Sequence, residues 1–178
     1  MGETSSVREI VLDLIPPDHV GIDIGFGGDK IREDFIGLDR ANDKFFVDLV
    51  FDLESGPIPV ADSKFDVVYC SHVLEKFENP DFLLKEMARI CRPAGRMILV
   101  FPDQRKYEDN CARLGTEPDR GNKIPDLSLA WMIKKVDSLD LIGPPQIFAT
   151  EIEPYNCILA FALKKAIRFE KTKRNNSK

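Results

Sequence analysis

The segment "GIDIGFGGDKIREDFIGLDR", residues 21–40, constrains the fold of this chain more than any other. It reads as two short apolar strands around a glycine-rich turn, and each strand carries an aspartate, Asp23 and Asp39. A strand, a glycine turn and a second strand that ends in an acid are typical of the first unit of a parallel nucleotide-binding sheet. Only "DKIRED" remains, however, for the helix that normally joins two such strands.

The rest of the chain predicts alternating helices and strands. An amphipathic helix is expected over "SSVREIVLDLI", ended by Pro16 and Pro17, and a second over "NPDFLLKEMARICRPAG", capped by Asn79 and ended by "RPAG". Apolar runs typical of strands occupy residues 19–24, 34–39, 44–51, 65–71 and 96–101. A helix around residues 125–136 and a pair of strands, 145–152 and 155–165, complete the pattern.

This alternation predicts an α/β fold with a Rossmann-like, mostly parallel sheet, an antiparallel edge hairpin and helices on both faces. We expect one domain over residues 1–163, followed by residues 164–178, which hold the end of the last strand and a basic tail. The polar stretch 102–123 is expected to be a long loop. Ligands of such sheets bind beyond the carboxyl ends of the strands, where the glycine turn and Asp39 fall.

The net charge of −5 is unevenly distributed along the chain. From Lys164 onward there are seven basic residues and one acid, so this tail carries +6 and the first 163 residues carry −11. A basic arm could contact nucleic acid, but an acidic body repels phosphate. A solvated terminus is therefore the favoured interpretation, and nucleic acid is a disfavoured partner.

Composition argues against a membrane or metal protein. No run approaches the ~20 apolar residues of a membrane span, and the first residues lack the apolar core of a signal peptide, so we expect a cytoplasmic protein without a membrane partner. The four cysteines, Cys70, Cys91, Cys111 and Cys157, are far apart and form no C-x-x-C pair. We expect them to be reduced and predict no metal site; the oligomeric state stays open.

The glycine turn departs from the dinucleotide-binding pattern. That pattern is G-x-G-x-x-G with an acid about 20 residues further on. Gly25 and Gly27 match it, but the third position is Lys30, and Asp39 follows Gly25 by only 14 residues. The missing helix leaves no dipole for a pyrophosphate. S-adenosylmethionine, which has a ribose but no phosphate, is the ligand expected instead, with Asp39 accepting hydrogen bonds from the ribose hydroxyls.

At this point the sequence resembles the class I S-adenosylmethionine-dependent methyltransferases, and within them the small type 11 group with a shortened first helix. The resemblance covers roughly residues 20–103 and rests on four blocks in order: "GIDIGFGG", "FIGLD", "VDLVFDLESGPIPVADSKFDVVYCSHVLEKF" and "FLLKEMARICRPAGRMILVFPD". Two positions depart from it. Lys76 stands where many relatives have histidine, and Ala94 stands where glycine is usual in the Pro-Gly-Gly turn.

The resemblance implies a methyltransferase with S-adenosylmethionine as cofactor. The implied cofactor-binding residues are Gly25, Phe26, Gly27, Lys30, Asp39, Arg40, Asp52, Leu53, Cys70 and Ser71. Asp52 is expected either to accept a hydrogen bond from the adenine amine or to cap a turn. Lys30 either replaces the positive potential of the missing helix near the methionine carboxylate or is solvated. Asp23, inside the first strand, is expected to orient the glycine turn rather than contact the ligand.

Candidate catalytic residues lie near the expected methyl group. His72 is either a general base toward the acceptor or a packing residue beside the cofactor. Asp103 and Tyr107, on the expected loop 102–123, line an acceptor pocket opposite His72, unless that loop is merely solvated. The acceptor is expected to be a small molecule of unassigned chemistry. The alternatives are a methyltransferase-like binding protein without catalysis and an RNA-modifying enzyme that uses the basic tail.

Overall fold

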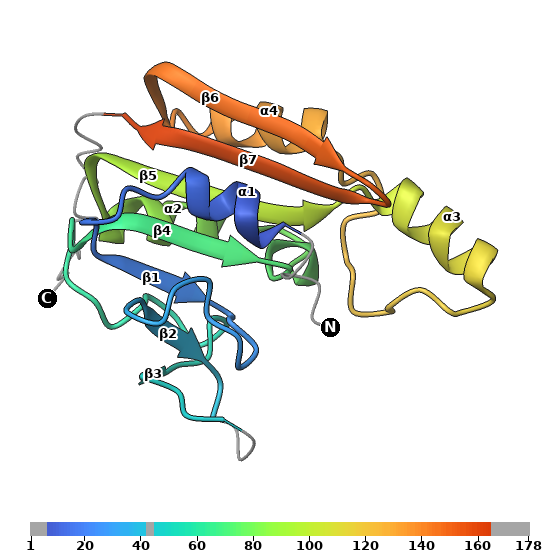
Figure 1. Ribbon diagram of the computed structural model, residues 1–178, viewed down its shortest axis with the longest axis horizontal. Helices are drawn as coiled ribbons and strands as arrows, with labels where there is room; N and C mark the ends of the chain where they lie inside the picture. The colour runs from blue at the N-terminus through green and yellow to red at the C-terminus, as the bar shows by residue number, and fades with distance from the viewer. Residues whose placement is uncertain (1–6, 42–44, 165–178) are drawn as a thin grey trace, which may run out of the picture.

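The computed structural model describes residues 7–41 and 45–164, in which seven strands form one sheet (Figure 1). The strands are β1 (Gly21–Ile24), β2 (Ile36–Asp39), β3 (Leu49–Val50), β4 (Phe65–Ser71), β5 (Cys91–Pro102), β6 (Ile142–Ile152) and β7 (Asn156–Leu163). The helices are α1 (Arg8–Asp13), α2 (Asp81–Ile90), α3 (Gln104–Leu114) and α4 (Leu129–Ser138), with a one-turn 3₁₀ helix, η2 (Leu74–Lys76).

The sheet has the strand order β3-β2-β1-β4-β5-β7-β6. Strands β1 to β5 run parallel to one another, and β7 is antiparallel to both β5 and β6. The predicted fold class is therefore confirmed, including the hairpin at the edge. The basic tail, on which the RNA-modifying alternative depends, lies outside the described residues from residue 165 onward.

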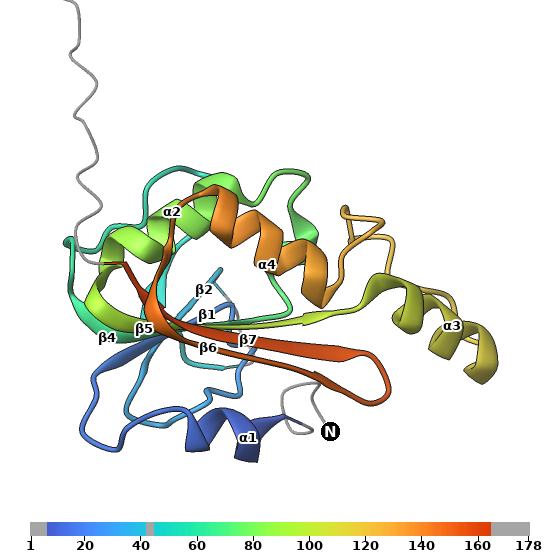
Figure 2. The same cartoon turned by 90° about the horizontal axis from the view of Figure 1, so that it is seen from above.

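Helices cover the two faces of the sheet unequally. Figure 2 shows α2 and α4 on one face and α1 on the other. The apolar stripe of α2, Leu83, Leu84 and Met87, is buried in the larger core cluster with residues of β4 and β5. On the opposite face Val7 and Val11 at α1 belong to a smaller cluster. The central strands β1 and β4 are thus buried along their whole length, which explains why they read as mostly apolar runs.

A loop replaces the helix between β1 and β2, as "DKIRED" led us to expect. Within the described residues the chain passes from β1 to β2 without a helix, and Ile31 and Phe35 of the loop enter the smaller core cluster beside α1. Asp23 holds this loop, because its Oδ2 accepts a hydrogen bond of 2.7 Å from the Ile31 N–H. The carboxylate therefore binds just beyond the glycine turn that it was expected to orient.

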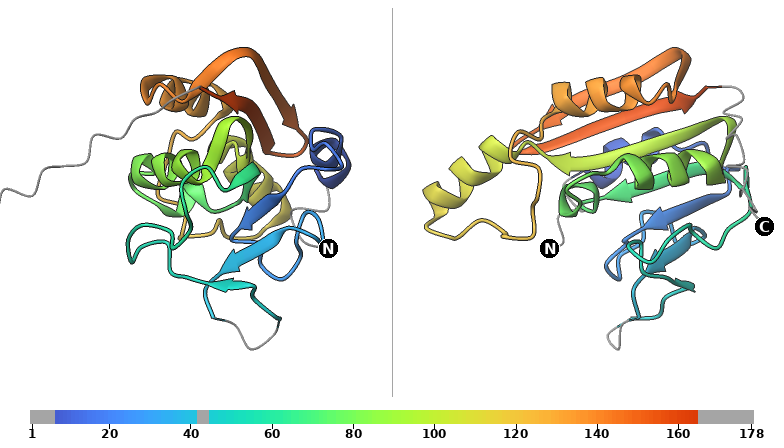
Figure 3. Two further views of the ribbon diagram at one scale, coloured as in Figure 1. Left: turned by 90° about the vertical axis from the view of Figure 1, so that its left-hand side faces the viewer. Right: turned by 180° about the vertical axis from the view of Figure 1, so that it is seen from behind.

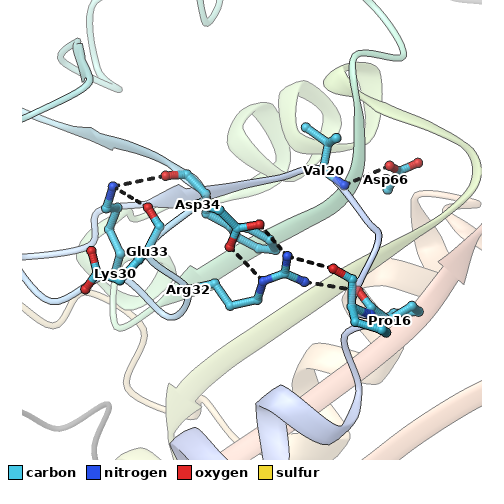
Figure 4. Close-up of polar contacts among 9 residues, drawn as sticks. Pro16, Val20, Lys30, Arg32, Glu33, Asp34 and Asp66 are labelled. Atoms are coloured by element: carbon cyan, nitrogen blue, oxygen red, sulfur yellow. Dashed lines mark hydrogen bonds and ion pairs between the residues drawn. The ribbon is translucent and has the colours of Figure 1, made fainter.

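The same loop is tied to the segment that leaves α1. The Arg32 guanidinium donates to the carbonyl oxygens of Pro16 (3.0 Å) and Pro17 (3.1 Å) and pairs with Asp34, as Figure 4 shows for Pro16 and Asp34. The hydrogen bonds of Arg32 to two backbone carbonyls and the burial of Ile31 and Phe35 thus hold the connection between β1 and β2 in place without a helix.

Two expectations about elements were wrong. Residues 102–123 are not one long loop, because α3 spans Gln104–Leu114; Asp103 caps it by accepting from the Lys106 N–H (3.1 Å), and Gly115 ends it with φ 68°. The helix stands beyond the end of the sheet (Figure 3), and of its residues only Gln104 and Cys111 are buried. Of the strand expected over residues 44–51, residue 44 lies outside the described residues, and the remainder forms only β3, of two residues.

The turn after α2 also differs in detail from the expectation. The helix ends at Ile90, and "RPAG" falls within β5, where the register with β4 shifts. Ala94 has φ 62°, a left-handed conformation that glycine adopts more easily than alanine, which accounts for the glycine usual in related turns. Among the residues that the structure describes, no helix is both long and apolar enough to cross a membrane.

Candidate active site

A cavity of about 270 Å³ opens at the carboxyl ends of β1, β2 and β4. Its lining comes from the glycine turn, the end of β2, the segment after β3 and the segment after β4. The lining residues are Gly25, Leu38, Asp39, Arg40, Phe51, Leu53, His72, Val73, Lys76 and Phe77. This is the position in which sheets of this kind bind their ligands.

The glycine turn forms one wall through its backbone. Gly25 has φ 71°, and its N–H donates to the Leu38 carbonyl at 2.7 Å. A Cβ atom at Gly25 would lie 2.2 Å from Cγ2 of Val73, so no larger residue fits there without moving the cavity wall. Gly27 has φ 60°, and a Cβ atom there would meet no atom within 4 Å. Packing therefore requires the first glycine, which its conformation also favours, whereas conformation alone favours the second.

Asp39 presents a fixed carboxylate at the end of β2. Its Oδ2 accepts from the Gly27 N–H at 2.9 Å, and its Oδ1 accepts from the Arg40 N–H at 2.8 Å. Each carboxylate oxygen has a further lone pair, so the group can still accept hydrogen bonds from a ligand. The Arg40 guanidinium pairs with Asp52 (3.3 Å) and Glu54 (3.5 Å); all three side chains are exposed, so these pairs contribute little stability.

Lys30 lies outside this cavity. Its Nζ contacts the Asp48 carboxylate (3.1 Å) and the carbonyl oxygens of Glu33 (3.0 Å, Figure 4) and Phe35 (3.2 Å). The Gly37 N–H, together with the Lys30 ammonium, holds the pKa of Asp48 below its usual value. The charge of Lys30 is thus compensated locally, and the geometry does not support the role expected for it in replacing the helix dipole.

Four other residues implied by the resemblance do not border the cavity either. Asp52 accepts from the Glu54 N–H (3.0 Å), which is the turn-capping alternative, whereas its neighbour Leu53 does line the cavity. Phe26, Cys70 and Ser71 are buried. Burial raises the pKa of the Cys70 thiol well above its usual value, so this cysteine stays protonated and unreactive.

Sequence reasoning missed most of the apolar wall. Leu38 and Phe51 flank the predicted acids, and Val73 and Phe77 lie on either side of η2 within "HVLEKF". No local spacing identifies Val73 and Phe77, because they flank a 3₁₀ turn, in which residues three apart and not four apart share a face.

A second, polar cavity of about 40 Å³ adjoins the first. Its lining residues are His72, Glu75, Lys76, Pro102, Tyr107, Asp119, Asn122 and Tyr155. His72 and Lys76 border both cavities. The backbone of His72 is left-handed, with φ 54°, and its N–H donates to the Val100 carbonyl at 2.9 Å. Non-glycine residues in this conformation are uncommon and gather at functional sites.

Tyr107 lines the polar cavity together with His72, from α3 rather than from the expected loop. Its hydroxyl accepts from the Asp119 N–H at 3.0 Å, and its ring packs edge-on against Tyr155, with the centroids 5.0 Å apart. Partial burial raises the pKa of Tyr107, so the phenol stays protonated at neutral pH. Asp103 does not border the cavity, because its carboxylate is used to cap α3.

Lys76, which replaces the histidine of many relatives, joins the segment after α3 to the site. Its Nζ contacts Asp119 Oδ2 (2.5 Å) and Asn122 Oδ1 (2.7 Å). The Lys76 ammonium also holds the pKa of Asp119 below its usual value. Nearby, the Lys123 N–H donates to the Glu75 carbonyl at 2.6 Å. The segment 119–123 is therefore held against the polar cavity by residues that a sequence pattern does not connect.

Comparison with known proteins agrees with this geometry. Residues 19–99 match the type 11 methyltransferase family model, described as a methyltransferase domain. The ubiquinone/menaquinone biosynthesis C-methyltransferases UbiE of Paraburkholderia xenovorans and Paraburkholderia phytofirmans are each 34% identical to this chain over 65 residues. That stretch is 36% of this chain and 27% of each relative, so the match spans about a quarter of their length.

Solved structures share the whole fold. An S-adenosylmethionine-dependent methyltransferase from Thermotoga maritima superimposes with a TM-score of 0.68 at 17% identity, covering 90% of this chain and 89% of that one. One from Aquifex aeolicus gives a TM-score of 0.61 at 13% identity, covering 92% and 94%. The resemblance read from the sequence is thereby confirmed. The chain has the class I methyltransferase fold, and its residues 19–99 match the type 11 methyltransferase domain model.

Proposed function

We propose that this protein transfers a methyl group from S-adenosylmethionine to a small-molecule acceptor held beside His72. The observation that carries the proposal is the Asp39 carboxylate, fixed at the end of β2 on the edge of a largely apolar cavity, within a methyltransferase domain.

The residues around the larger cavity fit this cofactor. Asp39 can accept hydrogen bonds from both ribose hydroxyls, and charge-assisted bonds of this kind are strong. Leu38, Leu53 and Phe77 offer apolar surface for an adenine ring. The turn at Gly25 lets the backbone approach the methionine end closely.

The bound cofactor supplies an already activated methyl group, so the main task of the protein is to hold the acceptor in line with it. His72 borders both cavities and is in a position to remove a proton from the acceptor. Tyr107, protonated at neutral pH, can donate a hydrogen bond that orients the acceptor. Lys76, through Asp119, holds the wall of the polar cavity in place.

The cofactor is tested by thermal unfolding. S-adenosylmethionine and S-adenosylhomocysteine should stabilise the protein, by about 2.7 kcal/mol at a ligand concentration a hundred times Kd, whereas NAD should not. Equal stabilisation by NAD would contradict the proposal. Incubation with methyl-labelled cofactor and a metabolite mixture then separates an enzyme, which forms labelled product, from a binding protein, which forms none.

Replacing Tyr107 with phenylalanine should lower turnover about tenfold and leave cofactor affinity within about twofold. Tyr107 lines the polar cavity and not the larger one, and one hydrogen bond is worth about 1–1.5 kcal/mol. Steady-state kinetics and calorimetric titration of the cofactor measure the two quantities. Lys106→Gln on the same helix is the control, because Lys106 pairs with Glu151 away from the cavity. Full activity of Tyr107→Phe would place the acceptor elsewhere.

A further inference from the structure

Glu75 is a buried carboxylate whose role the sequence leaves undecided. Glu75 is 1% exposed and lies on η2, the single 3₁₀ turn that follows β4. Its Oε1 lies 3.2 Å from Nδ1 of His72, three residues earlier. The 3₁₀ turn after β4 thus brings the Glu75 carboxylate against one ring nitrogen of His72.

Burying a carboxylate is costly unless the group is paired. The second oxygen of Glu75, Oε2, makes no hydrogen bond with any described residue, and Glu75 borders the polar cavity. The neighbouring ammonium of Lys76 is directed to Asp119 and Asn122 instead. A buried carboxylate with one unpaired oxygen does not stabilise the fold, so stability does not explain why this position holds a glutamate. The contact of Glu75 with the His72 imidazole does explain it.

Other charged or titratable groups face His72 across the two cavities. Asp39 and Arg40 lie around the larger cavity, and Lys76, Tyr107, Asp119 and Tyr155 lie around the smaller one. Arg40 is paired with two exposed acids, and Lys76 is paired with Asp119. The Glu75 carboxylate reaches a ring nitrogen of His72 directly, at 3.2 Å.

We propose that Glu75 is a positioning residue that holds His72 in the Nδ1–H tautomer and thereby makes Nε2 its basic nitrogen. An ionised carboxylate can only accept a hydrogen bond, so Nδ1 must carry the proton. In the neutral ring the lone pair then belongs to Nε2. The negative charge of Glu75 also favours the protonated ring that forms when Nε2 takes up a second proton.

The role of His72 as a base in methyl transfer rests on the proposed function, whereas the proposed tautomer of His72 does not. As the acceptor atom forms its bond to the methyl carbon, its proton passes to Nε2 and the electron pair of the carbon–sulfur bond stays on sulfur. His72 becomes an imidazolium next to Glu75 and returns the proton to water before the next turnover. Glu75 itself touches only His72 in this scheme.

Nitrogen NMR can read the tautomer without a known acceptor. The chain has two histidines, His19 and His72, so protein labelled with ¹⁵N-histidine gives two ring spectra, and His19→Gln assigns them. Above the pH at which the ring titrates, long-range ¹H–¹⁵N spectra should show His72 protonated on Nδ1. In Glu75→Leu, which keeps an apolar side chain in the buried position, the Nε2–H tautomer should become populated.

The charge of Glu75 is tested separately. Glu75→Gln retains an oxygen acceptor but loses the charge, so the pH at which His72 takes up its proton should fall by about one unit or more. The matched control is Glu78→Gln, an exposed glutamate three residues along, whose screened charge should leave that pH nearly unchanged. Amide spectra establish that each variant is folded.

The outcomes are distinct. A wild-type His72 protonated on Nε2, or equal titration of Glu75→Gln and Glu78→Gln, would overturn the proposal even if methyl transfer is found. If Glu75→Leu does not fold, the comparison of the two glutamine variants decides. Failure of the wild type to bind S-adenosylmethionine would remove the proposed function while leaving the tautomer result intact. Where activity is found, Glu75→Gln should move the acid limb of the pH–rate profile to lower pH.

Discussion

Replacing Asp39 with alanine should weaken the binding of S-adenosylmethionine by about 1.5–3 kcal/mol, roughly 10- to 150-fold in Kd. The carboxylate is held by the N–H groups of Gly27 and Arg40, so a ligand meets it already in place. Its remaining lone pairs would accept from both ribose hydroxyls. Calorimetric titration of the wild type and the variant measures the loss directly.

Two further variants sharpen this result. Asp39→Asn keeps one acceptor oxygen and should fall between the wild type and Asp39→Ala. Asp52→Ala removes an exposed carboxylate thirteen positions along the chain that does not border the cavity, and it should change the affinity little. Unchanged binding by Asp39→Ala would contradict the proposed site, and a large loss in Asp52→Ala would show that Asp52 contacts the adenine after all.

The stability of Asp23→Asn relative to the wild type should increase as the pH rises from about 4 to about 7. Asp23 is 1% exposed, and its burial raises the pKa to about 7 from the ordinary value of 3.8. Between these two values the unfolded chain releases the proton while the folded protein keeps it. The wild-type protein therefore loses unfolding free energy as the pH rises from the ordinary pKa of 3.8 to the raised pKa of about 7. Asparagine has no proton to release.

The expected difference is large. Three pKa units correspond to about 4 kcal/mol of unfolding free energy, and asparagine retains an oxygen for the Ile31 N–H. Urea unfolding followed by circular dichroism at pH 4.5 and pH 7.5 measures it. Asp18→Asn, an exposed aspartate just before β1, is the control and should show little dependence on pH. If the unfolding free energies of Asp23→Asn and the wild type differ by the same amount at both pH values, Asp23 is ionised in the folded protein.

Local patterns were sufficient for the elements whose side chains are buried on every side. Strand β4 was predicted over residues 65–71 with its observed bounds, because a strand covered on both faces is mostly apolar. Helix α2 carries its own start signal and an apolar stripe, both of which are properties of neighbouring residues. Helix α3 buries only Gln104 and Cys111, so its sequence is mostly polar, and it was missed for that reason.

The sequence by itself determined the fold class, the shortened connection after β1 and the position of Asp39 at the end of β2, because each depends on residues close together in the chain. Only the tertiary structure decided which partner each polar side chain takes. Lys30 is directed to Asp48, and Lys76 is directed to Asp119. A charged side chain binds the nearest compensating group in space, and which group is nearest depends on how the strands are ordered in the sheet.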